Sequence, residues 1–424
     1  MVKKVMGSVV LAAGLLGACG GPAEEAAGPA PAVDSPEASL DRLVELDAGE
    51  GFVAALQTAL ITAEAGDEIV MPAGTFELTD GLSLDADRVT LRGAGQAETV
   101  LNFAGQTGAG EGLLVTSDDV TLTGFTIQDT AGDGIKSKGA DRITYANLTV
   151  EWTGEPDEDN GAYGVYPVES SDVLVDGVTV RGASDAGVYV GQSDRIVVRN
   201  SVAEYNVAGI EIENSTNADV YNNRAENNAG GILVFDLPDL PKVGGHSTRI
   251  FDNMVINNNT RNFAPPGNIV ASVPSGTGVI ILANKNVHVF DNTFDNNRSA
   301  HVLLTAYSDP FEDERYNPLP RDIVLRDNSY TGVGYDPQQD LADLAPLLGG
   351  SLPPVVWDGV TRWGDAPDSD VQIVMSEAED VGFLSLGLGA YPLNPANLAP
   401  SMDRPTGGDI AEPGAVVLIH DKTG

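Results

Sequence analysis

The middle of the chain repeats itself every 22 to 23 residues. Three segments align without gaps, beginning at Ser171, Ser193 and Thr216. Each contains a short alternating apolar run, a turn marked by Gly or Asn, a second short run, another turn and a strand led by Gly. Similar segments begin near residues 120, 143, 250, 287 and 323. One such unit cannot bury its own apolar side, so the units must stack on one another.

The composition of the repeat decides between two stacked architectures. Leucine-rich repeats share the length, but they require Leu at fixed offsets and a helical half. Here Val and Ile dominate, and Asn, Asp and Gly interrupt the runs at short intervals. The sequence therefore predicts an all-β fold, a single-stranded right-handed parallel β-helix over residues 47–334, with each repeat forming one rung.

One polar column recurs at the same turn of the repeat. Because Asn tolerates the left-handed conformation, and because stacked amides can hydrogen-bond from rung to rung, we expect a structural asparagine ladder at this turn. Its expected members are Gly177, Asn200, Asn223, Asn253, Asn292 and Asn328, with Asn147 one rung earlier.

Both ends of a β-helix need a cover. Residues 49–65 have a helical period with Phe52, Leu56, Ala59, Leu60 and Ala63 on one face, and Asp47 and Glu50 resemble a capping box. We expect this helix to cap the amino-terminal end. After residue 334 the period disappears and Pro, paired Leu, Trp357 and Trp363 appear, which predicts an irregular carboxy-terminal cover over 335–424. A separate small domain is the alternative.

The amino terminus resembles a bacterial lipoprotein signal over residues 1–19. Lys3 and Lys4 precede an apolar run that is shorter than the ~20 residues needed to span a bilayer, and small residues lead into Cys19, the only cysteine of the chain. By this resemblance Cys19 becomes the lipidated first residue, and Gly20 directs the protein to the outer membrane, facing the periplasm or the cell surface. Residues 20–46 are predicted to be a flexible acidic tether.

The charge of the chain excludes one class of partner. It has 23 basic and 62 acidic residues and a formal net charge of −39, and its basic residues form no run beyond Lys3 and Lys4. Such a protein repels phosphate backbones, so nucleic-acid binding is excluded.

The Gly-led strand places chemically active side chains on the outside of the β-helix. If Ile135, Val165, Val188 and Ile210 point inward, alternation directs a ladder outward whose members lie about 5 Å apart. Its members are Lys136, Tyr166, Tyr189 and Glu211, with Lys138 and Glu213 two positions further along and Tyr163 at the start of its strand. An acidic loop containing Asp157 and Asp159 precedes Tyr163. Aromatic faces flanked by hydrogen-bonding groups suit sugar rings, whereas the alternative is a solvated face with Lys–Glu pairs.

Further along, the same ladder becomes apolar at Leu233, Phe235, Ile280 and Leu282. An uncovered apolar strip would be a binding surface for an envelope protein partner. We expect instead that the loop over 237–246 or the carboxy-terminal segment covers it.

The segments IVMPAGTFEL, DGIKSKG, NGAYGVYPV and the run from AGVYVGQS to GGILVFD resemble the periplasmic parallel β-helix repeat lipoproteins of Gram-negative bacteria. More broadly, the chain is similar to the carbohydrate-binding and sugar-hydrolase repeat proteins, which include pectate lyases, alginate lyases and mannuronan epimerases. The resemblance covers about residues 45–335. It implies an extracytoplasmic protein that binds a polysaccharide, or alternatively a lyase or epimerase. A non-catalytic envelope scaffold is the third hypothesis.

Lyase or epimerase chemistry would require a base, a proton donor and neutralisation of a uronate carboxylate. Lys136 could be the base and Tyr166 or Tyr189 the donor, with Ca²⁺ held by Asp133, Asp157 or Asp185. The epimerase motif Tyr-Gly-x-Asp-Pro-His is matched only in part, because its catalytic Asp and His positions hold Tyr166 and Val168. Hydrolysis needs two carboxyls, for which Glu211 and Glu213 are the candidates. The partial motif favours binding over catalysis.

Overall fold

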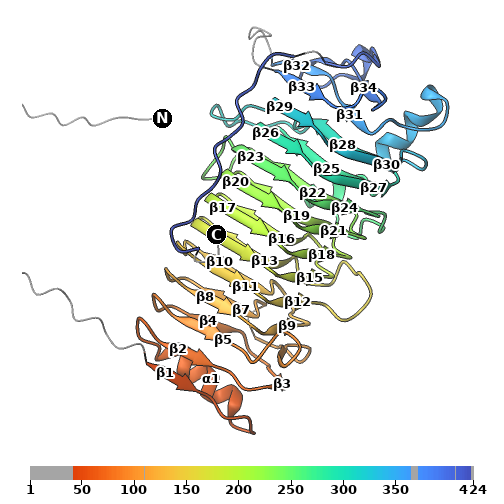
Figure 1. Ribbon diagram of the computed structural model, residues 1–424. Coiled ribbons are helices and arrows are strands. Elements are labelled where there is room, and N and C mark those ends of the chain that lie inside the picture. Colours follow the sequence, from red (N-terminus) through yellow and green to blue (C-terminus); the bar gives the residue numbers. More distant parts are fainter. Residues whose placement is uncertain (1–41, 109, 364–370, 406, 422–424) are drawn as a thin grey trace, which may run out of the picture. The chain divides into compact units, whose positions relative to one another are not determined.

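The computed structural model describes residues 42–108, 110–363, 371–405 and 407–421. The expected signal at 1–19, its Cys19 and most of the expected tether lie outside these residues. The described chain confirms the predicted right-handed parallel β-helix, with three sheets running along its length and successive rungs stacked on one another (Figure 1).

Sheet A has twelve strands in the described residues, all paired in parallel. They are β1 (Leu43–Glu45), β2 (Glu68–Val70), β5 (Thr90–Arg92), β8 (Thr121–Thr123), β11 (Thr144–Ala146), β14 (Ser171–Asp176), β17 (Asp194–Arg199), β20 (Thr216–Tyr221), β23 (His246–Phe251), β26 (Lys285–Phe290), β29 (Arg321–Arg326) and β33 (Ile373–Ser376).

Sheet B has ten strands within the same ranges. They are β3 (Gly74–Glu77), β6 (Thr99–Asn102), β9 (Thr126–Gln128), β12 (Thr149–Glu151), β15 (Thr179–Arg181), β18 (Val202–Glu204), β21 (Arg224–Glu226), β24 (Met254–Ile256), β27 (Thr293–Asn297) and β30 (Ser329–Val333).

Sheet C, formed by the Gly-led strands of the repeat, has eleven strands in the part of the chain described. They are β4 (Leu82–Leu84), β7 (Leu113–Val115), β10 (Ile135–Lys138), β13 (Tyr163–Val168), β16 (Ala186–Gly191), β19 (Ala208–Glu213), β22 (Gly230–Phe235), β25 (Thr277–Leu282), β28 (Ala300–Thr305), β31 (Val355–Trp357) and β34 (Phe383–Ser385).

The core is the interior of the β-helix, where one residue column from each sheet meets the others. In sheet C the inward column pairs Ile135 with Val165, Val165 with Val188, and Val188 with Ile210. All four side chains are fully buried in the main apolar cluster. Each buried side chain of this size contributes roughly 1.5–3 kcal/mol relative to exposure. The predicted inward register of sheet C is therefore confirmed.

The asparagine ladder forms, but with a different register from the one predicted. Asn223 N–H donates to Asn253 Oδ1 at 2.9 Å, and Asn253 N–H donates to Asn292 Oδ1 at 3.0 Å. Asn292 continues the ladder to Asn328. The corresponding position one rung before Asn223 is Ser201, whose N–H donates to Asn223 Oδ1 at 3.0 Å.

Asn200, Gly177 and Asn147 were wrongly assigned to this ladder. They stand one position earlier, in an outward column whose members have φ values of 53°, 66° and 51°. Asn serves both columns, because it accepts the left-handed conformation in one and offers its amide in the other. The sequence pattern does not distinguish these two uses.

A second asparagine ladder, missed in the sequence, occupies the turn between sheets B and C. Its members are Asn206, Asn228, Asn258 and Asn297, and the main-chain N–H of each of the first three donates to the side-chain oxygen of the next member. The Asn228 N–H to Asn258 Oδ1 distance, for example, is 3.1 Å. Asn206, Asn228 and Asn297 lie two or three residues before β19, β22 and β28, whereas the insertion separates Asn258 from β25.

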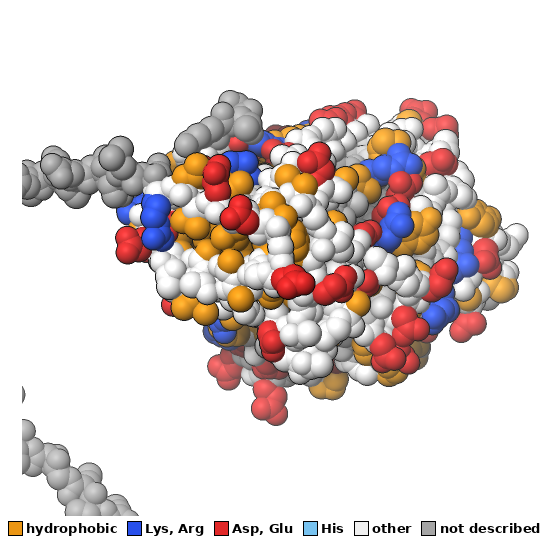
Figure 2. All heavy atoms as spheres, turned by 90° about the horizontal axis from the view of Figure 1, so that it is seen from below, with side chains coloured by type: hydrophobic (Ala, Val, Ile, Leu, Met, Phe, Trp, Pro, Cys, Tyr) orange, Lys and Arg blue, Asp and Glu red, His pale blue; other side chains and the backbone are white. Residues whose placement is uncertain are grey.

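The amino-terminal cap is helix α1 (Phe52–Ile61), shorter than the expected 49–65. It buries Phe52, Leu56, Ala59 and Leu60, as predicted, and the Phe52 ring stacks on Phe76 with centroids 3.6 Å apart. The expected capping box is not formed. The N-cap residue, which directly precedes the helix, is Gly51, and no side chain caps this end. Figure 2 shows this end, where hydrophobic side chains lie among acidic ones.

Strand β1 pairs in parallel with β2. Regular structure therefore begins inside the range expected to be a tether. No helix in the described ranges has the length and apolarity that crossing a membrane requires.

The β-helix continues beyond residue 334. Strands β31 and β34 extend sheet C and β33 extends sheet A. The period is hidden there by an insertion that contains the short helices η2 (Gln339–Asp343) and η3 (Ala345–Leu348). Strands β32 (Val360–Trp363) and β35 (Gly389–Tyr391) form a separate pair, and η5 (Pro395–Asn397) follows. The expected irregular cover is thus partly a continuation of the β-helix.

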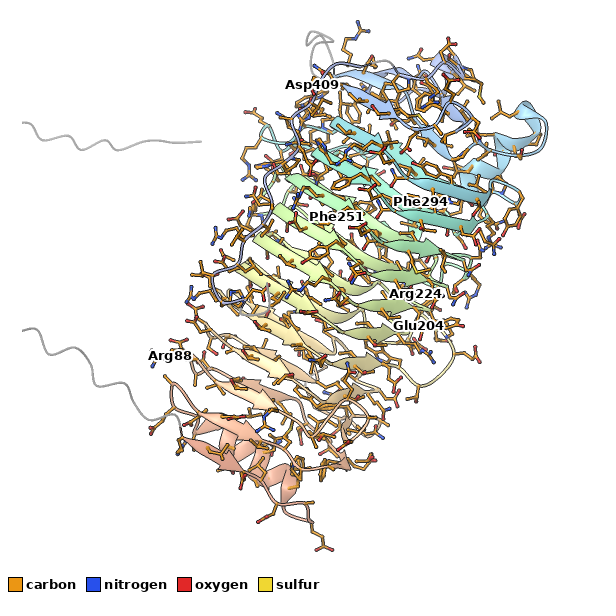
Figure 3. All side chains as sticks on the ribbon, viewed as in Figure 1. Arg88, Glu204, Arg224, Phe251, Phe294 and Asp409 are labelled. Carbon is orange, nitrogen blue, oxygen red and sulfur yellow. The ribbon has the colours of Figure 1, made fainter. Side chains whose placement is uncertain are left out.

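The last described segment, residues 407–421, returns along sheet A toward the middle rungs (Figure 1), beginning near Asp409, which is labelled in Figure 3. Glu412 forms ion pairs with Arg249 and Arg326, both at 3.0 Å. Beneath it, the outward rings of Tyr221, Phe251 and Phe290 stack 4.9–5.0 Å apart. We call this segment the C-terminal strap.

The apolar strip of sheet C is covered, so it is not available as the envelope-partner surface considered above. Leu233, Phe235 and Ile280 are buried and Leu282 is partly buried. Two segments supply the cover. The insertion between β24 and β25 packs Phe263, Val270 and Val273 into the same apolar cluster. It includes the short helix η1 (Ile269–Ser272). The carboxy-terminal segment covers the next ladder residue, Leu303, with Leu341 and Leu344, so that part of the expectation is confirmed.

Candidate functional site

The outward ladder of sheet C has the predicted register. Lys136 pairs with Tyr166 across β10 and β13, and Tyr189 pairs with Glu211 across β16 and β19. Glu213, two residues after Glu211, is paired with Gly191. Because the intervening residues of these strands point into the core, the ladder side chains are directed to the outer face of sheet C.

Three tyrosines form one aromatic group on this face. The centroids of Tyr163 and Tyr166 are 4.5 Å apart, and Tyr163 lies 4.6 Å from Tyr189. Tyr166 and Tyr189 meet edge to face at 4.9 Å, and Lys136 Nζ lies 4.7 Å from the Tyr166 centroid. The rings therefore pack on one another, and they do not form the row of flat faces that strand spacing alone would produce.

Three carboxyl groups lie beside the tyrosines and are almost completely buried. The Tyr189 hydroxyl donates to Glu213 Oε1 at 2.6 Å, and Asn268 Nδ2 donates to Asp185 Oδ2 at 3.2 Å. Glu211 is only 1% exposed, and neither of its carboxyl oxygens has a hydrogen-bond partner in the described residues. A buried polar group without a partner is rare and calls for an explanation. We call Asp185, Glu211 and Glu213 with the three tyrosines the tyrosine–carboxyl cluster.

The surroundings of the cluster favour neutral carboxyl groups. Burial raises the pKa of Asp185 to about 7 and that of Glu213 to about 7. Burial, together with the neighbouring Glu213 and Asp185 charges, raises the pKa of Glu211 well above its ordinary value. Burial raises the pKa of Tyr166 to about 12. Near neutral pH this face therefore holds hydroxyl and carboxylic-acid donors.

Charge near the cluster is confined to its edge. Lys136 Nζ is 3.3 Å from Asp133 Oδ2 and 3.9 Å from Glu111 Oε1. Burial raises the pKa of Asp133, against the opposing effect of Lys136. The one lysine of the cluster edge is thus already paired with carboxylates.

The remaining predicted site residues lie apart from the cluster. Lys138 is exposed and pairs with Glu169 at 3.6 Å. Asp157 and Asp159 lie in an exposed turn, where the Asp159 N–H donates to Asp157 Oδ1 at 3.0 Å. Within the described ranges, no group of three or more His, Cys, Asp or Glu side chains is arranged to hold a metal ion.

A cavity on the opposite side was not predicted. It has a volume of about 440 Å³ between sheet A and the C-terminal strap, and it is lined by Asp119, Arg142, His420 and Asp421 among others. Its strap residues come from a part of the sequence without a repeat, so no pattern pointed to it. Its Arg142 is already held by Asp119 at 2.6 Å.

Comparisons with known proteins agree on the fold. A family model described as a right handed beta helix region matches residues 111–261. The family 28 exopolygalacturonase of Yersinia enterocolitica is 13% identical, with a TM-score of 0.51 over 80% of this chain and 71% of that one. The polygalacturonase of Erwinia carotovora ssp. carotovora is 12% identical, with a TM-score of 0.49 over 82% and 96%.

An alginate lyase from Paenibacillus sp. str. FPU-7 is 19% identical, with a TM-score of 0.44 over 69% of this chain and 97% of that one. The comparison with curated proteins gave no match. The exopolygalacturonase and the family model support the right-handed parallel β-helix fold of this chain, and at 13% identity the likeness concerns architecture alone.

Proposed function

We propose that the protein binds a glycan at the tyrosine–carboxyl cluster on sheet C. The observation that carries the proposal is the buried carboxyl of Glu211, which has no partner in the described residues and lies on the rung next to Tyr189. A sugar offers what this face lacks, because its hydroxyls can pair with a carboxyl group and its C–H face can pack on aromatic rings.

The charge of the face favours an uncharged glycan. Three carboxyls surround the tyrosines, and Lys136 is already paired with Asp133 and Glu111. A uronate would bring further negative charge to a chain of net charge −39. Four rungs span roughly 15 Å, which suits about three sugar units.

A carbohydrate-active enzyme of the lyase or epimerase type is the second candidate. It is favoured by the pKa values of Asp185 and Glu213, both raised to about 7 by burial, because acid–base catalysts work best near the operating pH. The exopolygalacturonase that shares this fold is, by its name, also an enzyme of polysaccharides. Against this candidate, Lys136 is occupied by Asp133, and Tyr166 and Val168 stand where the epimerase motif has Asp and His.

A panel experiment separates binding from catalysis. The purified chain is titrated calorimetrically with cellohexaose, mannohexaose and laminarihexaose, and with tetragalacturonate as the anionic member. Each mixture is then assayed for new reducing ends and for ultraviolet absorbance from unsaturated ends. Heat of binding without new ends supports the proposed function, and unsaturated ends support a lyase. Binding of tetragalacturonate alone contradicts the preference for an uncharged sugar.

We also propose that the protein is anchored to the outer membrane through a lipid on Cys19. The support is the sequence before Cys19, with its two lysines, short apolar run and small residues. Cells that express the chain are fed an alkyne-tagged fatty acid. The expected result is a labelled protein that loses its label in the Cys19→Ser variant. An unlabelled wild-type protein, or a label that survives the substitution, contradicts the anchor.

A further inference from the structure

The tyrosine–carboxyl cluster is closed over in this structure. Glu211 is 1% exposed and Tyr189 is 6% exposed, so a glycan cannot reach either side chain as it stands. The insertion between β24 and β25 packs into one apolar cluster with Tyr189 and Leu233, the ladder residues on the two rungs that flank Glu211. If the proposed function is correct, this insertion must move.

The insertion has the construction of a loop that moves as one piece. Its ends are fixed to the solenoid, since Thr260 N–H donates to Asn228 O at 3.1 Å and Gly276 N–H donates to Ala229 O at 3.0 Å. Ser275 Oγ also bonds to Thr260 O at 2.5 Å, which holds the two ends together. Compact surface loops with adjacent ends and their own internal packing commonly carry function.

Inside the loop, one asparagine maintains the shape. Asn262 Nδ2 donates to Val270 O at 2.8 Å and to Val273 O at 3.0 Å. These two bonds do not involve sheet C, so they survive when the loop leaves it. The interior of the loop is thus organised independently of the surface that it covers.

The loop touches the cluster through a replaceable contact. Phe263, Val270 and Val273 share one apolar cluster with Tyr189 and Leu233. A hydrogen bond from the loop to the carboxyl groups runs from Asn268 Nδ2 to Asp185 Oδ2, at 3.2 Å. The loop thus offers this surface apolar packing on an aromatic ring and one hydrogen bond from a side-chain amide. A sugar could offer the same surface equivalent contacts through its C–H face and its hydroxyls.

We propose that residues 261–274 form a lid over the tyrosine–carboxyl cluster, and that an uncharged sugar takes the place of the lid's apolar side chains on Tyr189 and brings its hydroxyls to Glu211. The inference rests on the proposed function, to which it adds the route of access. In the closed state Phe263, Val270 and Val273 occupy the place of the ligand. We call Asn268 the latch, because its hydrogen bond to Asp185 holds the lid to the cluster.

The charges around Glu211 agree with a lid that closes over neutral groups. From sheet C it faces Glu213 and Asp185, with the tyrosines 163, 166 and 189 around them and the paired Lys136 at the edge. The one charged residue of the lid, Arg261, is exposed, and it does not contribute to the charges that act on Glu211. Closure therefore favours the protonated carboxyls, and opening is favoured as the pH rises through about 7, the pKa of Asp185 and Glu213.

Site-resolved labelling of Glu211 tests the lid without any glycan. The full chain is treated with a water-soluble carbodiimide and glycine ethyl ester, which modify accessible carboxyl groups, and the rate at Glu211 is measured by mass spectrometry. Two variants loosen the lid, Phe263→Ala by removing apolar contact and Asn268→Ala by removing the latch. Matched controls are Phe311→Ala and Asn160→Ala, which alter loops elsewhere; Phe311 packs on Tyr316 and Asn160 bonds to Gly182 O.

We expect Glu211 to be labelled at least tenfold faster in each lid variant than in the wild type, and at the wild-type rate in each control. Circular dichroism verifies that the variants are folded. If Phe263→Ala does not fold, Asn268→Ala alone decides. Rapid labelling of Glu211 in the wild type, or equal rates in folded wild type and Asn268→Ala, overturns the lid.

The glycan arm keeps the two proposals distinguishable. Hydrogen exchange in peptides from 261–274 is measured with and without the hexasaccharide that binds in the panel. Faster exchange on binding, with unchanged exchange in 237–245, supports displacement of the lid. Binding that leaves exchange in 261–274 unchanged overturns it. Lid variants whose Glu211 is labelled rapidly but which bind no sugar would give a split result. Residues 261–274 would then be shown to cover Glu211, whereas the proposed glycan binding would be contradicted.

Discussion

At the residue scale, the asparagine side chains replace main-chain hydrogen bonds that the turns of a β-helix cannot form. Asn253 accepts from the main chain of Asn223 and donates to Val220 O at 2.9 Å, so one amide serves two neighbouring rungs. Both partners are buried, and water does not replace a lost bond there at low cost. The ladder therefore stabilises the turn and also fixes the register of the strands on either side.

Replacing Asn253 with Ala should destabilise the protein strongly. The change removes the acceptor of the Asn223 N–H and a donor to Val220 O, and an unsatisfied buried group costs about 1–3 kcal/mol. We expect the free energy of unfolding to fall by about 2–4 kcal/mol in urea titrations. Asn200→Gly is the matched control, because it keeps the left-handed conformation at φ 53° and lies outside the ladder. Equal losses in the two variants would contradict the revised register.

The buried Glu213 should make stability fall as the pH rises. Its pKa is about 7 in the folded chain, against 4.5 ordinarily, so the folded state holds a proton that the unfolded state has released. This contribution is fully present below about pH 4.5 and is lost as the pH rises through about 7. Glu213→Gln keeps an acceptor for Tyr189 without the titration. We expect it to be more stable than the wild type by about 1–3 kcal/mol at pH 8, and similar to it at pH 4.5.

Chemical denaturation at the two pH values measures this difference. Exposed Glu98→Gln is the control and should follow the wild type at both. A Glu213→Gln variant that gains nothing at pH 8 would show that the Glu213 carboxyl does not hold a proton in the folded state near pH 7.

At the scale of elements, the C-terminal strap is held by side chains. Leu418 is 5% exposed and packs on Leu174 and Val197, whereas its neighbour Ile419 is 83% exposed. Arg199 and Asp421 form an ion pair at 2.8 Å near the end of the described strap. An element of this kind detaches at lower free energy than the rungs beneath it.

Leu418→Ala should loosen the strap and leave the β-helix folded. Truncating a buried Leu costs about 2–5 kcal/mol, enough for at least tenfold faster hydrogen exchange in residues 407–421. Ile419→Ala removes a similar number of atoms from the exposed face and should leave exchange unchanged. The proposed docking of the strap through Leu418 would be contradicted if both variants exchanged at the wild-type rate.

At the scale of the whole molecule, charge should make the fold sensitive to salt. The chain has a net charge of −39, and self-repulsion destabilises a compact state. Raising NaCl from about 10 to 150 mM shortens the screening length from about 30 to 8 Å. The expected result is a higher melting temperature, because salt screens the repulsion between the acidic side chains. Salt also weakens the exposed ion pairs, but these contribute little to stability, so their loss is small. Sorbitol at matched osmolarity is the control, and a fall in melting temperature with NaCl would contradict this account.

The sequence predicted the architecture because the repeat encodes it locally. The inward Val165, Val188 and Ile210 recur at 22 to 23 residues, and this spacing alone places Tyr189 beside Glu211. The turn register was harder, since Asn200 and Asn223 are one residue type with two uses. The lid was not predicted, because an insertion without a repeat carries no signal of the surface on which it packs. The burial of Glu211 and its raised pKa were missed as well, because strand alternation predicts the direction of a side chain and not what packs around it.

Calorimetric titration of a variant with one substituted tyrosine, Tyr166→Ala, tests whether a glycan binds at the tyrosine–carboxyl cluster. Tyr166 is partly exposed there, whereas Tyr335, 53% exposed elsewhere, is the matched control. With the hexasaccharide that binds best, Tyr166→Ala should weaken binding by about 0.5–1.5 kcal/mol, and Tyr335→Ala should bind as the wild type does. Folded Tyr166→Ala with unchanged affinity would place the glycan elsewhere and contradict the account.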